Sequence, residues 1–247
     1  MNKTIVVMPA YNAAKTLAKT FQDIPKDKVA EIILGDDCSE DQTILIAQSL
    51  GLEVLKTPCN LGYGGNQKML YQEALRRGAT IVVLLHPDWQ YDATKIPELI
   101  APIAAGEKDV MLGSRILGGR AGTLAGGMPL YKYLSNRFLT LVENMTFNFS
   151  LSELHTGFRA FSAPVLKKVS YELNSNDFVF DSEMLAQIAV QKFRVGEVPV
   201  PCRYFPEASE INFWRSSCYG LQTLLVCLKF MLHKLKIKEL EQFIAKC

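Results

Sequence analysis

Several side chains suited to binding an anionic nucleotide follow four apolar runs of the sequence. In chain order they are Pro9, Tyr11, Asp36, Asp37, His86, Asp88, Gln90 and Arg115. Asp88 and Gln90 offer the oxygen ligands that a hard cation prefers, and the other carboxylates could hydrogen-bond a base or a ribose. Arg115 adds a permanent charge with paired N–H donors for phosphate. Together these residue types suit a nucleotide diphosphate.

Each of these residues also has an ordinary structural explanation when it is taken alone. The two adjacent aspartates could cap a helix, Asp88 could be a solvated acid of a turn, and Arg115 could form an ion pair at the surface. Their arrival at successive strand ends weakens these explanations, because the carboxyl ends of parallel strands meet at one edge of a sheet. We therefore expect one shared site.

The alternation of apolar and helical segments predicts the fold that would position this site. Strands are expected over residues 4–8, 31–34, 52–56, 79–85 and 110–112, with helical segments between them. Strands that alternate with helices at this spacing are typical of βαβ units. The run at 79–85 is apolar throughout, so it is expected near the centre of the sheet. The sequence predicts an α/β fold with a doubly wound, mostly parallel sheet and helices on both faces.

Composition and motifs exclude several classes of function. Of the 247 residues, 49% are hydrophobic and 21% are charged, which is ordinary for a globular protein. A net charge of +2 gives no reason to expect a nucleic-acid partner. Residues 60–65 are glycine-rich and are expected to form a turn, but they lack the spacing of a dinucleotide-binding loop after the first strand. The sequence has no P-loop motif either.

The sequence favours a cytoplasmic protein. Its six cysteines form no C-x-x-C pair, and a chain of this size does not need disulfides to fold. The apolar run at residues 5–8 is too short for the apolar region of a signal peptide. No run of uncharged apolar residues is long enough to span a membrane.

The C-terminal segment differs from the rest of the chain in charge. Residues 213–247 contain six Lys or Arg and two acids, a charge of +4, whereas residues 1–212 sum to −2. Leucines recur there at helical spacing. We expect a catalytic domain over residues 1–212 and a basic, amphipathic helical extension over residues 213–247. That helix could pack on the domain or in an oligomer such as a dimer, or it could make a peripheral contact with an anionic membrane.

The ordered motifs resemble those of glycosyltransferase family 2. The similarity runs from about residue 3 to about residue 209, and residues 7–12, 36–39, 60–62, 88–90 and 113–115 carry it. The chain looks most like the dolichyl-phosphate mannose or glucose synthase branch, which has the GT-A fold. The resemblance implies an inverting transferase that moves a sugar from a UDP- or GDP-sugar donor. The acceptor would be a polyprenyl phosphate or a glycan hydroxyl.

The resemblance also implies roles for particular residues. The nucleotide-sugar would contact Pro9, Tyr11, Asp37, Asp88 and Arg115. Asp88 and Gln90 would hold Mg²⁺ or Mn²⁺ across the diphosphate. Residues 156–162 are similar to the family's segment on the acceptor side.

One position departs from the family pattern. The family usually has Asp-x-Asp after the central strand, whereas this chain has His86 two residues before Asp88. His86 could be a metal ligand, a donor to ribose or phosphate, or a packed turn residue, although Mg²⁺ prefers oxygen. If this change has removed metal function, the chain would be a non-catalytic nucleotide-sugar-binding protein.

Two further catalytic candidates lie in the second half of the chain. Arg203 falls where the family has an arginine in a loop over the diphosphate, and it could stabilise the leaving group. An ion pair with Glu207 is the ordinary alternative. Asp181 lies near the start of an expected helix, where it could be a catalytic base for a hydroxyl acceptor or a plain N-cap. An acceptor phosphate is already anionic and would need no base.

Overall fold

The fold is built around a seven-stranded sheet with the strand order β3-β2-β1-β4-β6-β5-β7. The computed structural model describes residues 2–119, 123–124, 126–204 and 213–246. The strands are β1 Thr4–Ala10, β2 Glu31–Asp36, β3 Glu53–Lys56, β4 Ile81–Leu84, β5 Val110–Ser114, β6 Arg159–Ser162 and β7 Val195–Pro199. Neighbouring strands are parallel except where β6 pairs with β4 and with β5. The predicted mostly parallel sheet is confirmed.

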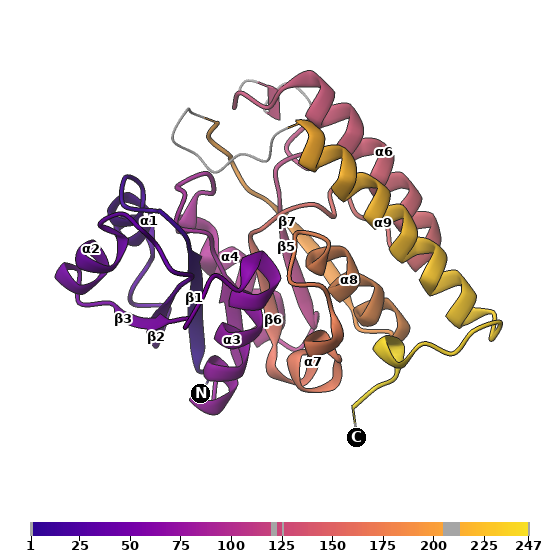
Figure 1. The fold of residues 1–247 in the computed structure, drawn as a ribbon, viewed down its shortest axis with the longest axis horizontal. Helices are drawn as coiled ribbons and strands as arrows, with labels where there is room; N and C mark the ends of the chain where they lie inside the picture. The colour runs from indigo at the N-terminus through magenta and orange to yellow at the C-terminus, as the bar shows by residue number, and fades with distance from the viewer. Residues whose placement is uncertain (1, 120–122, 125, 205–212, 247) are drawn as a thin grey trace.

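Helices cover both faces of this sheet (Figure 1). They are α1 Leu17–Asp23, α2 Thr43–Ser49, α3 Gly62–Arg76, α4 Ile96–Ala104, α6 Leu130–Phe147, α7 Ala163–Lys168, α8 Phe180–Val190 and α9 Phe213–Lys234. One core cluster joins the sheet to α1, α2 and α4, and the other joins it to α3, α6, α7, α8 and α9. Alternate side chains of β1 enter opposite clusters, Ile5 on one side and Val6 on the other, as the pleat requires.

Two local features differ from the sequence expectation. The glycine-rich residues 60–65 do not form a free turn, because α3 begins at Gly62. A Cβ atom at Gly64 would lie 2.5 Å from the carbonyl oxygen of Ser175, so the glycine lets α3 approach the segment that leads into α8. Strand β7 was not predicted, since Gly196 and Glu197 interrupt its apolar pattern.

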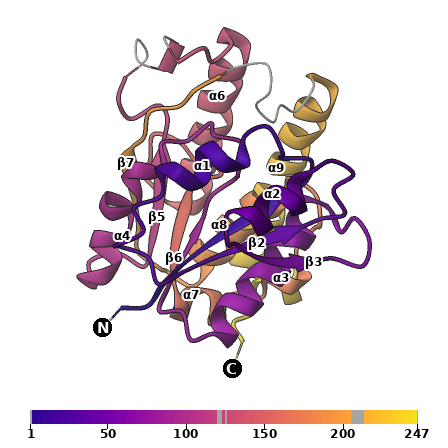
Figure 2. The same ribbon diagram turned by 90° about the vertical axis from the view of Figure 1, so that its left-hand side faces the viewer.

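Helices α6 and α9 form an outer layer beyond α8. They run side by side in Figure 1, and Figure 2 has the opposite edge of the molecule, with α1 and α2, toward the viewer. The inner face of α9 places Val226, Cys227 and Phe230 in the core, which confirms the predicted C-terminal amphipathic helix. None of the helices in the described residues is both long and apolar enough to cross a membrane.

Candidate active site

A cavity of about 840 Å³ opens beyond the carboxyl ends of β4 and β5, between the sheet and the helices α6 and α9. Four of the predicted site residues line it, namely Asp88, Gln90, Arg115 and Asp181. This is where ligands bind in open α/β sheets. The other predicted residues, Pro9, Tyr11, Asp37 and Arg203, lie outside the cavity wall. The structure therefore divides the predicted site into a cavity and a neighbouring edge of the sheet.

Asp37 holds the beginning of α3 in place. Its Oδ1 accepts hydrogen bonds from Leu61 N at 2.7 Å and from Thr57 Oγ1 at 3.0 Å, and its Oδ2 accepts one from Gly62 N at 2.9 Å. Three donors thus satisfy a carboxylate that is only 4% exposed. Asp37 therefore accepts from backbone N–H groups at the beginning of a helix, as the capping interpretation of the sequence allows. The helix is α3, which lies further along the chain than α2.

The ends of the neighbouring strands carry the other residues that were expected to contact the nucleotide. Pro9 is buried in β1, and Tyr11 just beyond it is 53% exposed. Asp36 accepts a hydrogen bond from Ser39 N through Oδ2. Its buried Oδ1 has no hydrogen-bond partner among the described residues. A buried acceptor without a partner is unusual, so Asp36 rather than Asp37 retains an unused carboxylate oxygen at this edge.

Asp88 and Gln90 lie together on the cavity wall. The backbone N–H of Gln90 donates to Asp88 Oδ1 over 3.1 Å, and burial raises the pKa of Asp88 to about 6. A carboxylate and an amide oxygen in a poorly solvated wall fit a hard divalent cation. No group of three or more His, Cys, Asp or Glu in the described part of the chain is arranged to hold a metal ion.

His86 also lines the cavity and packs against Tyr63. The two rings stack with centroids 5.3 Å apart, and His86 Nε2 lies 3.3 Å from the Tyr63 hydroxyl. Because that hydroxyl donates to Asp181, its oxygen accepts from His86 Nε2–H. Burial lowers the pKa of His86 to about 4, so the ring is neutral at pH 7. These contacts match the packed-residue interpretation of His86 and leave Nε2 committed to Tyr63.

The carboxylate of Asp181 is also committed. Its Oδ2 accepts the Tyr63 hydroxyl at 2.7 Å and lies 3.3 Å from Nη2 of Arg159, a side chain that is 1% exposed. The N-cap of α8 is Val179, so the N-cap alternative for Asp181 does not apply. A carboxylate that neutralises a buried guanidinium is poorly suited to take a proton from a substrate hydroxyl.

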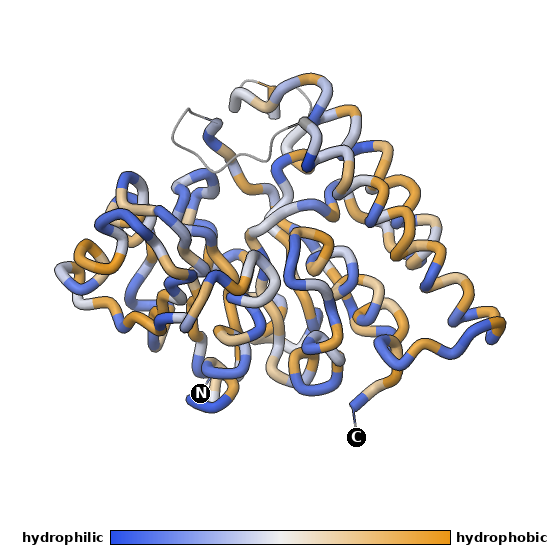
Figure 3. Tube along the Cα trace, in the orientation of Figure 1, coloured by the Kyte–Doolittle hydropathy of each residue, from blue (hydrophilic) through white to orange (hydrophobic). Residues whose placement is uncertain are grey.

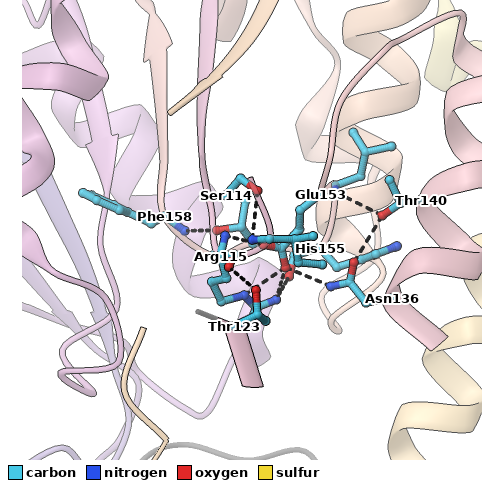
Figure 4. A network of polar contacts seen from close by, with 12 residues as sticks. Ser114, Arg115, Thr123, Asn136, Thr140, Glu153, His155 and Phe158 are labelled. Atoms are coloured by element: carbon cyan, nitrogen blue, oxygen red, sulfur yellow. Dashed lines mark hydrogen bonds and ion pairs between the residues drawn. The ribbon is translucent and has the colours of Figure 1, made fainter. Parts of the chain in front are cut away.

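Arg115 forms a buried ion pair rather than the surface pair considered from the sequence. Its guanidinium contacts Glu153, whose side chain is fully buried, and donates to the Tyr204 hydroxyl at 2.9 Å. Figure 4 shows Arg115 and Asn136 converging on Glu153, which Asn136 Nδ2 reaches at 2.8 Å. The ion pair fixes the end of β5 against the segment that follows α6 and compensates the charge of Arg115.

Arg203 is brought beside the Asp88–Gln90 segment by backbone pairing. Its N–H donates to the carbonyl oxygen of Gln90 at 2.8 Å. Its guanidinium lies 4.5 Å from the centre of the Trp89 ring and 3.4 Å from Asp23 Oδ2. The side chain remains 40% exposed. Glu207, its alternative partner from the sequence, lies outside the described residues.

Comparisons with known proteins identify the family. The model of glycosyl transferase family 2 matches residues 5–170. The chain belongs to this family. A UDP-N-acetylglucosamine–dolichyl-phosphate N-acetylglucosaminyltransferase of Methanococcus voltae is 28% identical over 216 residues, covering 81% of this chain and 85% of that protein. A low-salt glycan biosynthesis hexosyltransferase of Haloferax volcanii is 29% identical over 212 residues, covering 84% of this chain and 49% of that protein.

Solved structures agree on the fold of this family 2 protein. Glucosyl-3-phosphoglycerate synthase from Mycobacterium tuberculosis, in complex with UDP, matches with a TM-score of 0.69 at 17% identity, covering 93% of this chain and 80% of that one. The predicted GT-A fold is confirmed. The predicted family is confirmed as well, and a relative named for dolichyl phosphate supports the predicted branch. The protein is a glycosyltransferase.

Sequence reasoning missed several side chains that shape the family 2 site. They are Tyr63, Asn136, Glu143, Glu153, His155, Arg159 and Tyr219. Most lie within helices, where a polar residue normally indicates a solvated face. His155 and Arg159 carried a usable signal, because Arg159 lies within the acceptor-side segment 156–162 and His155 directly precedes it.

Proposed function

We propose that this glycosyltransferase moves a sugar from a nucleotide-diphosphate donor to a polyprenyl phosphate, with inversion at the anomeric carbon. The observation that carries the proposal is the shortage of bases in the cavity. Among the described residues, only Asp88 and Asp181 bring carboxylates to its wall. The two histidines on that wall, His86 and His155, each share a hydrogen bond with a tyrosine hydroxyl. Asp181 is paired with Arg159, and Asp88 is the candidate metal ligand. An acceptor that is already anionic fits such a site, because no proton has to be removed from it.

Asp88 and Gln90 would hold Mg²⁺ or Mn²⁺ in this proposal. Their oxygen donors fit these ions, and glucosyl-3-phosphoglycerate synthase was solved with Mn²⁺ and UDP. The bound ion would supply positive charge to the diphosphate as it leaves. Arg203, half-exposed and stacked on Trp89, would add a mobile cation on the same side.

The donor nucleotide would lie along the carboxyl ends of β1 and β2. Tyr11 offers an exposed ring there, next to Pro9, and Asp37 positions the backbone of the turn that leads into α3. Arg115 would shape the cavity wall near the phosphates of the donor. It would not offer them a free charge, because Glu153 neutralises its guanidinium. Transfer from a radiolabelled UDP-sugar or from a GDP-sugar distinguishes the two donor nucleotides.

The chemical step then needs little from the protein besides positioning. An oxygen of the acceptor phosphate attacks the anomeric carbon from the face opposite the diphosphate. The new carbon–oxygen bond forms as the bond to the diphosphate breaks, and the electron pair leaves with the diphosphate. Holding both reactants in line supplies much of the rate enhancement in such a transfer.

The outer surface of α6 and α9 supports a lipid acceptor. On α6, three of the five buried positions are polar, while Leu134, Phe138 and Leu141 are each more than half exposed. On α9, Leu221 is 70% exposed and Leu228 is 55% exposed. Figure 3 shows these apolar stretches on the outermost helices. Monomeric soluble proteins rarely leave so much apolar surface uncovered.

Part of this surface leads directly into the cavity. Leu134, Phe138, Leu221 and Leu224 belong both to the outer helices and to the cavity wall. An isoprenyl chain could therefore remain among apolar side chains while its phosphate reaches the donor. We propose that residues 213–247 form an extension of the catalytic domain 1–212 that makes a peripheral contact with the cytoplasmic face of a membrane. The lysines near the end of α9 would favour anionic lipids there.

Transfer assays with paired acceptors test the proposal. The protein is incubated with radiolabelled UDP- or GDP-sugars, Mn²⁺ and either a polyprenyl phosphate or the corresponding polyprenol. Label should move only to the phosphate. Asp88→Ala should abolish both transfer and the thermal stabilisation by nucleotide with Mn²⁺ while the fold is retained, whereas Asp92→Ala, outside the cavity, should preserve both. Nucleotide binding without transfer to any acceptor would instead support a non-catalytic binding protein.

A further inference from the structure

Trp89 lies between the two candidate cation ligands in an unusual backbone conformation. Its φ angle is 57°, in the left-handed region that a bulky side chain rarely adopts. Within the described ranges, it is the only aromatic residue among the non-glycine residues with a positive φ angle. Such a conformation persists only where the surrounding contacts hold it in place. The contacts of the Trp89 side chain show what holds it here.

Helix α1 provides the first set of these contacts. The indole Nε1–H donates to Asp23 Oδ2 at 2.9 Å, and the ammonium of Lys19 lies 4.7 Å from the centre of the Trp89 ring. Lys19 and Asp23 are four residues apart, so they lie on one face of the helix. The N-cap residue of α1, Thr16, donates through Oγ1 to the carbonyl oxygen of Pro87 at 2.6 Å. The turn that carries Trp89 is thus fixed to α1 at two points.

Arg203 provides the second set of contacts. Its guanidinium lies 4.5 Å from the centre of the Trp89 ring, and its Nη1 lies 3.4 Å from the oxygen of Asp23 that accepts the indole N–H. Its backbone N–H donates to the carbonyl oxygen of Gln90 at 2.8 Å. Cations are attracted to the electron-rich face of an aromatic ring, and most strongly to that of tryptophan. Trp89 therefore joins α1, the cation ligands and Arg203.

We propose that Trp89 is a positioning residue for the cation site. Its side chain keeps the turn between Asp88 and Gln90 left-handed, and this backbone conformation directs both ligands to the cavity wall. Trp89 itself is not part of the described cavity wall, so it acts through its two neighbours rather than by contact with a ligand. This role rests on the proposed function, in which Asp88 and Gln90 bind the cation.

The effect of Mn²⁺ on nucleotide binding tests this role without any measurement of transfer. UDP and GDP are titrated against the full chain by calorimetry, once with saturating Mn²⁺ and once with EDTA. The ratio of the two dissociation constants gives the strengthening by Mn²⁺. Trp89→Ala should reduce this strengthening about tenfold, because alanine lacks the ring contacts that offset the cost of a left-handed residue. The affinity in EDTA should not change.

Trp89→Gly separates the role of the backbone from that of the ring. Glycine adopts a positive φ angle without the steric cost, so this variant should recover most of the Mn²⁺ effect that Trp89→Ala loses. A role in side-chain packing alone predicts that glycine is no better than alanine. Trp214→Ala is the matched control, because it removes the other tryptophan, which is 76% exposed on α9. It should leave the Mn²⁺ effect unchanged.

An undiminished Mn²⁺ effect in folded Trp89→Ala would overturn the inference, and so would an equal loss in the alanine and glycine variants. Should Trp89→Ala not fold, Trp89→Phe replaces it, since phenylalanine keeps a ring but offers no N–H to Asp23. Its Mn²⁺ effect should be about threefold smaller than that of the wild type, and an unchanged effect would contradict the role of Trp89.

The wild-type protein separates this inference from the proposed function. A wild type without any Mn²⁺ effect would remove the proposed metal ligands and the role of Trp89 together. A wild type that shows the Mn²⁺ effect, loses it in Trp89→Ala and yet transfers no sugar would count against the proposed function alone.

Discussion

Replacing Asp181 with asparagine shows whether this carboxylate has a structural role or acts as a catalytic base. Asparagine keeps the shape of the side chain and an oxygen that can accept the Tyr63 hydroxyl. It removes the negative charge that faces Arg159, whose side chain is 1% exposed. Breaking a buried ion pair by removing one partner typically costs about 3–5 kcal/mol. The lower end applies here, because Arg159 also donates to backbone carbonyl oxygens of Thr156, Leu154 and Asp181 itself.

We therefore expect Asp181→Asn to lose about 3 kcal/mol of unfolding free energy. For a chain of this length that loss corresponds to a Tm about 6–12 °C lower. Urea unfolding at 25 °C followed by fluorescence measures the free energy directly. Transfer to polyprenyl phosphate, assayed well below the Tm, should retain at least a tenth of wild-type turnover, since no proton has to be removed.

Glu183→Gln provides the matched control. Glu183 lies two residues further along α8, and its Oε2 accepts from Ser175 N at 2.6 Å. Its replacement should cost about 1 kcal/mol, the usual value of one hydrogen bond. The reasoning fails if Asp181→Asn is as stable as the wild type while its turnover falls a hundredfold or more. That result would make Asp181 a base and would favour a hydroxyl acceptor.

Three other predictions concern pH and the outer surface. Side-chain hydrogen bonds from two neighbouring arginines lower the pKa of Glu73 from 4.5 to about 2. Its contribution of about 1 kcal/mol to the unfolding free energy is therefore complete above pH 4.5 and is lost as the pH falls through 2. Acid titrations of unfolding free energy should show this loss in the wild type and not in Glu73→Gln. Burial raises the pKa of Asp88 to about 6. Calorimetry should therefore show that the affinity for Mn²⁺ with nucleotide falls about tenfold per pH unit below pH 6 and levels off above it. An affinity that does not change with pH would show that Asp88 is not a ligand. Leu228→Glu on α9 should weaken sedimentation with anionic vesicles at least tenfold without changing the Tm, whereas Leu45→Glu on α2 should not; equal binding by both variants would exclude the membrane contact.

The sequence determined the architecture because apolar periodicity is a local property. Each run of β-forming residues was followed by a helical segment, and that alternation has few solutions besides a doubly wound sheet. The order of the motifs also pointed to the family, and the central apolar run at residues 79–85 contains β4. Strand β7 escaped prediction because its residues are half-buried and include a glycine, so the apolar pattern is weak.

The tertiary structure decided what the polar residues do. Asp37, Asp181 and Arg115 have suitable chemistry in the sequence, but each is satisfied by a partner that lies distant along the chain. Whether a carboxylate is free for a ligand depends on these contacts, and no spacing rule reveals them. The pair of Asp88 and Gln90 was the part of the site that local sequence could indicate, because both residues lie on one short turn.

The outer helices show the same division. The sequence of residues 213–247 indicated an amphipathic helix, since leucines at helical spacing form one apolar face. It did not indicate which way that face points. The inner face of α9 is filled by Val226 and Phe230, which leaves Leu221 and Leu228 outside, and three of the five buried positions of α6 are polar. The order of residues determines that a helix is amphipathic. The packing of the neighbouring helices and strands determines which of its side chains are buried.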